Sequence, residues 1–211
     1  MKLVRLPQGS PQWKGWRMSG IGGSDLAAIM GLAPYADATR ENLLAEKVTG
    51  RERETNFAMR RGTLLEPQAR AAYAERAVCV ADPVCVEHDD APWMRVSLDG
   101  LCYRRYAVGQ PWVLELKCPA WQTHDLALAG IVAKHFLVQC QWQLLVTGLD
   151  RLDFASFNPS QRFNPADWLA VVPVEADAEV QAETLGAAEG FWAEVCAARG
   201  VAGPALAAGV A

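Results

Sequence analysis

An apolar, strand-like run at residues 112–118 carries two charged side chains, and few buried strands accept that combination. Side chains alternate between the two faces of a β-strand, so Glu115 and Lys117 share one face. Leu114 and Leu116 take the other face. A charged pair inside an apolar strand is costly unless it has partners or a chemical role. The sequence therefore predicts a strand that presents a carboxylate and an ammonium group side by side.

A second carboxylate lies near this strand if the chain folds back as a hairpin. Asp99 stands in the stretch SLDG, and residues 104–110 provide the connection between two antiparallel strands. In that hairpin Asp99 faces Glu115, and two convergent carboxylates make a hard oxygen site for Mg²⁺ or Mn²⁺, with Lys117 beside the ion. The alternative is an ordinary surface ion pair, which such residues often form by chance. The apolar surroundings favour a metal site of the kind found in nucleases.

Length and composition fit one globular α/β or α+β domain. The chain has 211 residues, 51% hydrophobic and 21% charged, which is enough for a sizeable core. No apolar run is long enough to span a bilayer, and the first residues lack the apolar segment of a signal peptide, so we expect a cytoplasmic protein. The six cysteines form no CxxC pair that would indicate a zinc site. We expect a single nuclease domain over 1–199 and a flexible or subunit-docking tail over 200–211.

The net charge of −4 is unusual for a protein that binds DNA, because phosphates are neutralised by Lys and Arg. The distribution of charge matters more than the sum. Each local basic pair is compatible with a basic groove, and equally with a solvated surface. The pairs are Arg51 with Arg53, Arg60 with Arg61, and Arg104 with Arg105.

Periodicity and capping signals predict alternating helices and strands. The predicted helices cover 26–30, 39–48, 59–76, 133–146 and 178–198. The predicted strands cover 84–88, 93–103, 113–118, 152–158 and 171–174. The segment before Gly20 is expected to be irregular. Glycines ahead of the helix at 26–30 either expose backbone N–H groups to a phosphate or serve as a simple helix cap.

Several motifs, taken in order, resemble the bacteriophage lambda exonuclease family, also called YqaJ-like viral recombinases, which includes alkaline exonucleases. The resemblance covers about 13–148. It is carried by Trp13 and Arg17, then GIGGSD at 20–25, RGTLLEP at 61–67, SLDG at 97–100, LELKCP at 114–119 and QCQ at 139–141. No single motif is specific, but the ordered set is.

The resemblance implies a restriction-endonuclease-like (PD-(D/E)XK) α/β core, with a central mixed β-sheet flanked by helices. It implies a metal-dependent 5′-to-3′ exonuclease that digests double-stranded DNA from a 5′-phosphorylated end, releases 5′-mononucleotides and leaves 3′ single-stranded overhangs for single-strand annealing recombination. It further implies a two-metal mechanism with two Mg²⁺ or Mn²⁺ ions per active site, a homotrimeric ring around DNA, a single-strand annealing protein as partner, and no membrane association. The alternatives are an endonuclease of the same fold, a non-catalytic DNA-binding module, or a hydrolase of another phosphate ester.

The same resemblance assigns roles to residues of the predicted hairpin. Asp99, Glu115 and the main-chain carbonyl of Leu116 match the metal ligands. Lys117 matches the lysine that positions or deprotonates the attacking water.

Further residues match other parts of the family's site. Glu66, beside the apolar stripe of the helix at 59–76, matches a carboxylate that lines the site, although it also fits a solvated flank. Gln139 matches a glutamine of the last motif. Arg17 and Ser24 match a pocket for the terminal 5′-phosphate.

The remaining candidates concern DNA contact and an additional acid. Met59 stands where an apolar wedge separates the terminal base pair, although a core position also suits it. Arg60 and Arg61 are candidates for DNA binding. The family has an acid ahead of the SLDG-type motif, for which Asp89 has the expected spacing and Asp90 is its neighbour. Phe136 stands where the family can have a tyrosine, so a contact that needs the hydroxyl is missing here.

Overall fold

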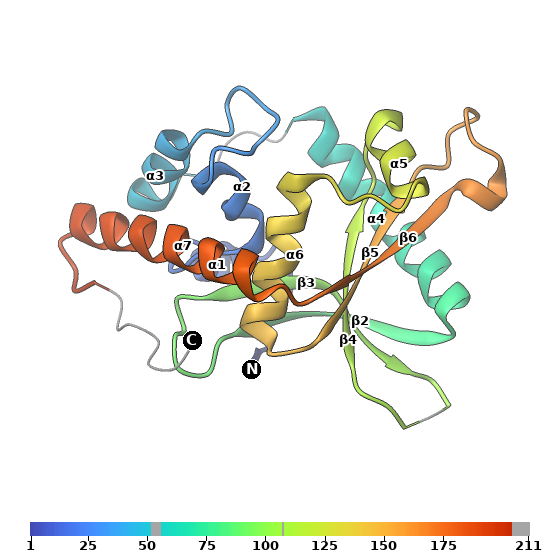
Figure 1. The fold of residues 1–211 in the computed structure, drawn as a ribbon. Coiled ribbons are helices and arrows are strands. Elements are labelled where there is room, and N and C mark those ends of the chain that lie inside the picture. The colour runs from blue at the N-terminus through green and yellow to red at the C-terminus, as the bar shows by residue number, and fades with distance from the viewer. Residues whose placement is uncertain (52–55, 107, 204–211) are drawn as a thin grey trace.

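The computed structural model describes residues 1–51, 56–106 and 108–203. These residues form a six-stranded sheet in which every strand lies beside its neighbours in sequence (Figure 1). All neighbouring strands are antiparallel except β4 and β5, which are parallel. The strands are β1 (Lys2–Val4), β2 (Cys79–Glu87), β3 (Arg95–Arg104), β4 (Trp112–Lys117), β5 (Arg151–Phe157) and β6 (Leu169–Glu175). This mixed sheet confirms the predicted fold class.

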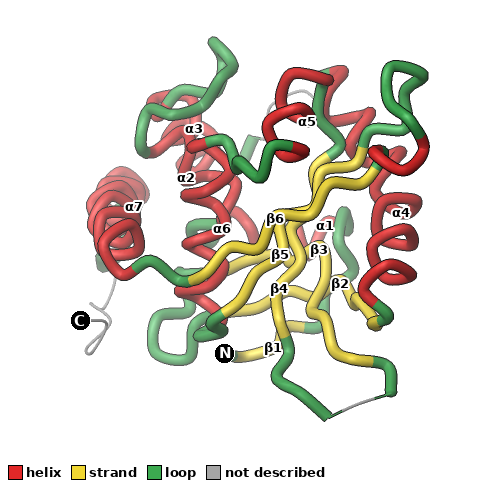
Figure 2. The backbone as a smooth tube through the Cα atoms, turned by 45° about the vertical axis from the view of Figure 1, so that its right-hand side comes forward, coloured by secondary structure: helices red, strands yellow, loops and turns green. Residues whose placement is uncertain are grey.

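Helices cover both faces of the sheet (Figure 2). They are α1 (Pro11–Met18), α2 (Leu26–Ile29), α3 (Arg40–Thr49), α4 (Phe57–Ala77), α5 (Trp121–Leu128), α6 (Lys134–Thr147) and α7 (Ala178–Arg199). A 3-10 turn, Gly23–Asp25, precedes α2. In Figure 2, α4 lies on one side of the sheet, whereas α2, α3, α6 and α7 lie on the other. None of these helices, within the described part of the chain, is long and apolar enough to cross a bilayer.

Two hydrophobic cores result from this arrangement. One lies between the sheet and α6, and includes Trp142, Phe154 and Phe191. The other lies between the sheet and α4, and includes Tyr73 and Trp112. Because both faces are covered, the central strand β4 is buried along most of its length.

The predicted hairpin is confirmed. Strands β3 and β4 pair antiparallel, with Gly100 opposite Leu114 and Cys102 opposite Trp112. Asp99 therefore stands one position beyond the paired residues, and its Oδ2 accepts a hydrogen bond of 2.7 Å from the Leu116 amide. The parallel connection from β4 to β5 needs a crossover, which carries α5 and α6.

The N-terminal segment differs from the prediction. It was expected to be irregular before Gly20, but it contains β1 and α1. The Ser10 side chain accepts from the Trp13 amide and Pro11 opens the helix, which are ordinary helix-start signals. Trp13 and Trp16 share a partly buried face of α1, but the helix has only eight residues and none is fully buried, so its apolar pattern is too short to mark it in the sequence.

Two further elements were missed or misplaced. Strand β2 begins at Cys79, not at residue 84, because its pairing with β3 shifts register between Asp82 and Val84, and this shift accommodates a proline within the strand. Helix α5 was not predicted, and its first residue follows Ala120, which offers no side-chain cap. The predicted C-terminal tail lies outside the described residues from position 204 onward, as does Arg53.

Candidate active site

A cavity of about 240 Å³ brings together six of the predicted site residues. It lies where α1, the 3-10 turn, the β3–β4 hairpin and α6 meet. The six residues are Arg17, Ser24, Asp99, Glu115, Lys117 and Gln139. Residues far apart in sequence are thus collected around one space.

Glu115 is the centre of a hydrogen-bonded cluster and is only 1% exposed. Its Oε1 lies 2.5 Å from Lys117 Nζ and accepts a bond of 2.7 Å from Gln139 Nε2. Its Oε2 accepts a bond of 2.6 Å from Gln143 Nε2. Both oxygens are therefore fixed, and the carboxylate is rigidly oriented. Gln143 was not among the predicted site residues, although it stands one helical turn from Gln139, a spacing that places both amides on one face of α6.

Asp99 lies beside this cluster, and its surroundings disfavour the charged form of its carboxyl group. Burial raises its pKa well above the ordinary carboxyl value, and the negative charges of Glu115 and Glu66 raise it further. Lys117 and the Leu116 amide act in the opposite direction. Two carboxylates that repel each other in a poorly solvated place favour a bound cation.

Lys117 provides the only positive charge that directly contacts Glu115 among the described residues. Burial disfavours the charge of Lys117, but the carboxylates of Glu115 and Asp99 outweigh burial and raise the pKa of this lysine. Its Nζ also lies 5.1 Å from the centre of the Phe136 ring, a cation–π distance. The ammonium group is therefore charged at neutral pH and is held against the Glu115 carboxylate.

The donor set fits a hard divalent cation. Asp99 and Glu115 provide carboxylate oxygens, and the Leu116 carbonyl lies on the same strand between Glu115 and Lys117. Within the described residues, no group of three or more His, Cys, Asp or Glu side chains could hold an ion unaided. An ion here would complete its coordination with water and phosphate oxygens, as Mg²⁺ commonly does.

Glu66 approaches Asp99 from α4, on the other side of the hairpin. Its carboxylate forms an ion pair with Arg70 one turn later on the same helix. Arg70 Nε in turn donates to the main-chain oxygen of Asp99 at 2.8 Å. Arg70 was not predicted, and the spacing of four residues from Glu66 was its only signal. Glu66 is thus placed near the carboxylate pair, but it is not one of the residues that border the cavity.

Arg17 and Ser24 both border the cavity and contact each other. Arg17 Nη2 donates to Ser24 Oγ at 3.0 Å, and the guanidinium lies 4.8 Å from the Trp13 ring centre. The Trp13 indole donates to Ser97 Oγ at 2.7 Å, which ties α1 to strand β3. A guanidinium and a hydroxyl side by side form a suitable site for a phosphate group.

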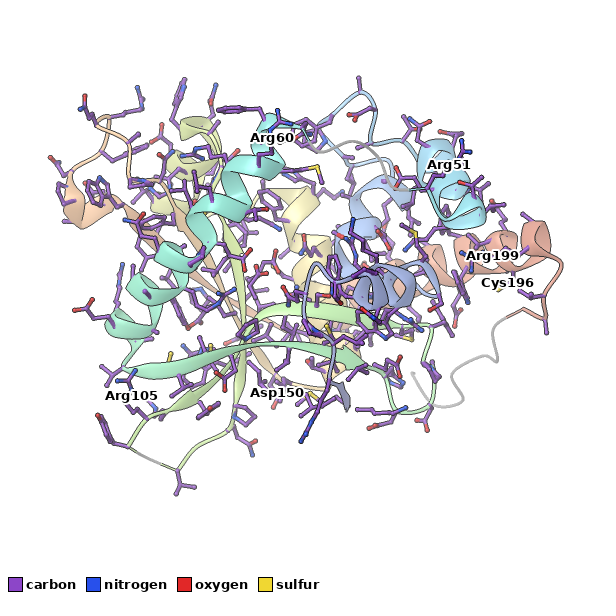
Figure 3. The ribbon with its side chains drawn as sticks, turned by 180° about the vertical axis from the view of Figure 1, so that it is seen from behind. Arg51, Arg60, Arg105, Asp150, Cys196 and Arg199 are labelled. Carbon is purple, nitrogen blue, oxygen red and sulfur yellow. The ribbon has the colours of Figure 1, made fainter. Side chains whose placement is uncertain are left out.

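The three residues of α4 predicted to contact DNA, Met59, Arg60 and Arg61, have different environments. Met59 is 50% exposed at the start of α4, and Arg60 is exposed beside it. Figure 3 shows Arg60 near the first turn of α4 and Arg105 beside the other end of that helix. The Arg61 guanidinium instead contacts the main-chain oxygens of Cys118 and Pro119, and donates to Asn158 at 3.1 Å. Arg61 therefore joins α4 to the loops that follow β4 and β5.

Asp89 lies away from the cavity. Its Oδ2 is 2.6 Å from the N-terminal ammonium of Met1, and its side chain is 64% exposed. The amide of Asp90 donates to His88 Nδ1 at 3.3 Å in the same exposed loop. Neither acid borders the cavity among the residues that the structure describes. The structure thus places Asp89 and Asp90 in an exposed loop away from the other predicted site residues.

Comparison with known proteins supports the family suggested by the motifs. A sequence model of the YqaJ-like viral recombinase domain matches residues 12–150. This chain belongs to that family. The match ends before β5, so the last part of the sheet and α7 lie outside it.

Solved structures agree with this assignment. The crystal structure of LHK-Exo in complex with dAMP is 28% identical, with a TM-score of 0.74 over 89% of this chain and 93% of that chain. A second structure, described as an alkaline exonuclease (LHK-Exo) from Laribacter hongkongensis, has a TM-score of 0.73 with the same identity and coverage. A phage-related exonuclease from Haemophilus somnus 129PT, 16% identical over 82% of this chain and 92% of that chain, shares the fold with a TM-score of 0.56. The comparison with curated proteins found no match.

This YqaJ-like chain is therefore a nuclease of the lambda exonuclease family with the restriction-endonuclease-like fold. The likeness to alkaline exonucleases implies a DNA substrate and, in general, a divalent metal cofactor.

Proposed function

We propose that this protein is a 5′-to-3′ exonuclease on double-stranded DNA that releases 5′-mononucleotides and leaves 3′ single-stranded overhangs. One observation carries the proposal: the same cavity is bordered by the Arg17–Ser24 pair and by the Asp99–Glu115–Lys117 cluster. A phosphate-binding pair beside a metal-binding cluster suits an enzyme that binds a chain end and cuts next to it. LHK-Exo was crystallised with dAMP, a mononucleotide of the class that this reaction releases.

The carboxylates would bind Mg²⁺ or Mn²⁺, with two ions per active site. In our proposal Asp99, Glu115 and the Leu116 carbonyl are the protein ligands. The bound ions supply Lewis acidity, activating water and stabilising charge on the phosphate that is attacked. Gln139 and Gln143 keep Glu115 in the orientation that ligation needs, because each donates to one of its oxygens.

Lys117 has the task of orienting the attacking water. Its ammonium contacts Glu115 and Lys117 borders the cavity, so it can donate to a water oxygen that approaches the scissile phosphate. Deprotonation of that water by Lys117 itself requires a lower pKa than the metal-free site gives this lysine. Glu66 assists in this proposal by adding negative charge near Asp99.

The polarity of digestion follows from the chain end. A terminal 5′-phosphate is negatively charged, whereas a 5′-hydroxyl is neutral. Arg17 and Ser24 can therefore bind the phosphorylated end more tightly than the hydroxyl end. Met59 and Arg60, exposed at the start of α4, are placed to contact the duplex outside the cavity. Arg61 supports them indirectly by fixing α4 to the loops beside the site.

The biological setting of the proposal comes from the family resemblance. It includes a homotrimeric ring that encircles the duplex, a single-strand annealing protein as partner, a role in recombination, and location in the cytoplasm.

Digestion of a linear duplex labelled at one 5′ end tests the proposal. The reaction is run with Mg²⁺, with Mn²⁺ and with chelator, on 5′-phosphorylated and 5′-hydroxyl ends, beside a covalently closed circle. We expect metal-dependent release of the label as mononucleotide, faster from phosphorylated ends, with the circle intact. Cutting of the circle would support an endonuclease of this fold instead. Equal rates on both kinds of end would refute end recognition by Arg17 and Ser24.

A further inference from the structure

The last turn of α1, which carries Arg17, is surrounded by positive side chains from three separate elements. Each of them donates to a different main-chain oxygen of this turn. Arg95 of β3 binds the Trp16 oxygen at 2.5 Å, Lys47 of α3 binds the Arg17 oxygen at 2.9 Å, and Arg199 of α7 binds the Met18 oxygen at 2.8 Å. The carbonyl oxygens at a helix C-terminus have no partners within the helix and carry partial negative charge, so cations stabilise them.

Lys47 is more than a helix cap, because it is buried and has further partners. Its side chain is 3% exposed, and its Nζ also donates to the Gly20 oxygen at 2.8 Å. The same Nζ lies 2.7 Å from Asp25 Oδ2, which accepts from the Gly22 amide. Lys47 thus binds both sides of the segment that separates Arg17 from Ser24. It fixes the spacing of the two groups proposed to bind phosphate.

The backbone at Gly20, between Arg17 and Ser24, also packs closely against the main chain at Trp93. A Cβ atom at Gly20 would lie 2.3 Å from the Trp93 main-chain oxygen, far inside an ordinary contact. The Ile21 amide donates to that same oxygen at 2.7 Å. The backbone after α1 is therefore pressed against the start of β3, and only glycine permits this approach.

Arg199 connects this segment to the end of α7, outside the region that matches the family model. Its Nε donates to the Lys47 oxygen at 3.1 Å, while its Nη2 donates to Met18. Its guanidinium lies 5.6 Å from the Trp192 ring centre on the same helix. Figure 3 shows Arg199 on α7, and its hydrogen bonds to Met18 and Lys47 place it against α1 and α3. Arg199 does not border the cavity in the described part of the chain.

We propose that Lys47 and Arg199 are positioning residues for the terminal phosphate: they fix the last turn of α1 so that Arg17 and Ser24 meet the 5′ end together. Neither residue touches the substrate. The inference rests on the end recognition given under Proposed function, and it adds two residues that the motifs do not include.

Two altered proteins test the proposal. Arg199→Met removes the hydrogen bonds of the guanidinium to the Met18 and Lys47 main-chain oxygens while keeping an apolar side chain beside Trp192. Lys47→Met is combined with Asp25→Asn, because the single change would leave a buried carboxylate without its cation. Arg40→Met is the matched control, since Arg40 also joins α3 to α7, through an exposed ion pair of 2.7 Å with Glu194.

Steady-state rates are measured on 5′-phosphorylated and 5′-hydroxyl duplexes at saturating Mg²⁺, beside thermal unfolding of each protein. We expect Arg199→Met and the double variant to raise KM for the phosphorylated duplex about tenfold, with a smaller change in kcat, because a misplaced guanidinium loses a charge-assisted bond. The preference for phosphorylated ends should fall by the same factor. Arg40→Met should keep the wild-type preference even if its melting temperature drops.

The outcomes are distinguishable. Wild-type preference in a folded Arg199→Met protein would overturn the positioning role of Arg199, and the double variant tests Lys47 in the same way. Loss of preference in Arg40→Met as well would overturn the inference in favour of general loosening between α3 and α7. Absence of any preference in the wild-type protein would instead refute the proposed end recognition itself.

Discussion

Replacement of Lys117 by methionine separates catalysis from metal binding. The lysine Nζ lies 2.5 Å from Glu115 Oε1 and 5.1 Å from the centre of the Phe136 ring. Because the carboxylates of Glu115 and Asp99 raise the pKa of this lysine against the effect of burial, it is charged at neutral pH. Methionine keeps the apolar stem against Phe136 but removes the charge and the hydrogen-bond donors. The change therefore affects both the attacking water and the electrostatics of the carboxylate pair.

The two effects have opposite signs. Loss of a group that orients or deprotonates water lowers the rate by about 10²–10⁴-fold, equivalent to about 3–5 kcal/mol in the barrier. Loss of a neighbouring positive charge strengthens the attraction of the carboxylates for a divalent cation. The interaction energy of two unit charges near a protein surface is up to about 4 kcal/mol. Solvent screens much of this energy at a partly exposed ammonium, so we expect metal binding to become about fivefold tighter.

Calorimetric titration with Mn²⁺ measures the affinity, and hydrolysis of a 5′-phosphorylated duplex at saturating metal measures the rate. Lys134→Met, at an exposed lysine that begins α6, is the control and should change neither quantity. A rate within about threefold of wild type would refute the role of Lys117 in the chemical step. Mn²⁺ binding weaker than that of the wild-type protein would refute the electrostatic reasoning.

Four further substitutions test other parts of the structure. The raised pKa of Asp99 means that the metal-free folded chain holds this proton more tightly than the unfolded chain, so the free energy of unfolding falls as pH rises above 3.8. In chelator, Asp99→Asn should raise the melting temperature at neutral pH by about 2–6 °C, and thermal scans should show the gain disappear toward pH 4. Arg60→Ala should weaken binding of duplex DNA and reduce the slope of affinity against salt by about one, whereas Arg61→Ala should lower stability by about 2–3 kcal/mol because it breaks bonds to main-chain oxygens. Salt titrations by fluorescence anisotropy and denaturant unfolding distinguish these two outcomes. Gly20→Ala places a Cβ 2.3 Å from the Trp93 oxygen, so the segment must shift by about 1 Å, and kcat/KM on phosphorylated ends should fall by up to about 10²-fold.

The carboxylate pair and its lysine could be predicted because they depend on local rules. Alternation along a strand fixes that Glu115 and Lys117 share a face, and a short connection fixes that Asp99 returns to it. The arrangement of sheet and helices followed from the resemblance of ordered motifs. These features involve residues that are close in sequence or that belong to a motif.

The remaining parts depend on contacts that no local pattern encodes. Helix α1 has only eight residues and none is fully buried, so its hydrophobic periodicity is too short to identify it. The sequence also cannot tell which arginine is exposed, as Arg60 is, and which is half-buried and binds carbonyl oxygens, as Arg61 does. In the sequence, Lys47 looks like an ordinary charged residue of an amphipathic helix. Only the folded structure shows that it is buried and donates to the Gly20 main-chain oxygen. Such roles are decided by tertiary packing, which overrides residue type.

The hydrogen bond between Arg199 and Met18 joins residues 181 positions apart. It therefore forms later, during synthesis on the ribosome, than contacts between residues that are closer in sequence. Asp99, Glu115 and Gln143 lie within one shorter stretch, so the carboxylate cluster and its amides can form while the chain is still growing. The turn that carries Arg17 is made early but is secured last, when the end of α7 emerges and docks against α1. A nascent chain would therefore have its cutting groups in place before the turn that carries Arg17 is secured.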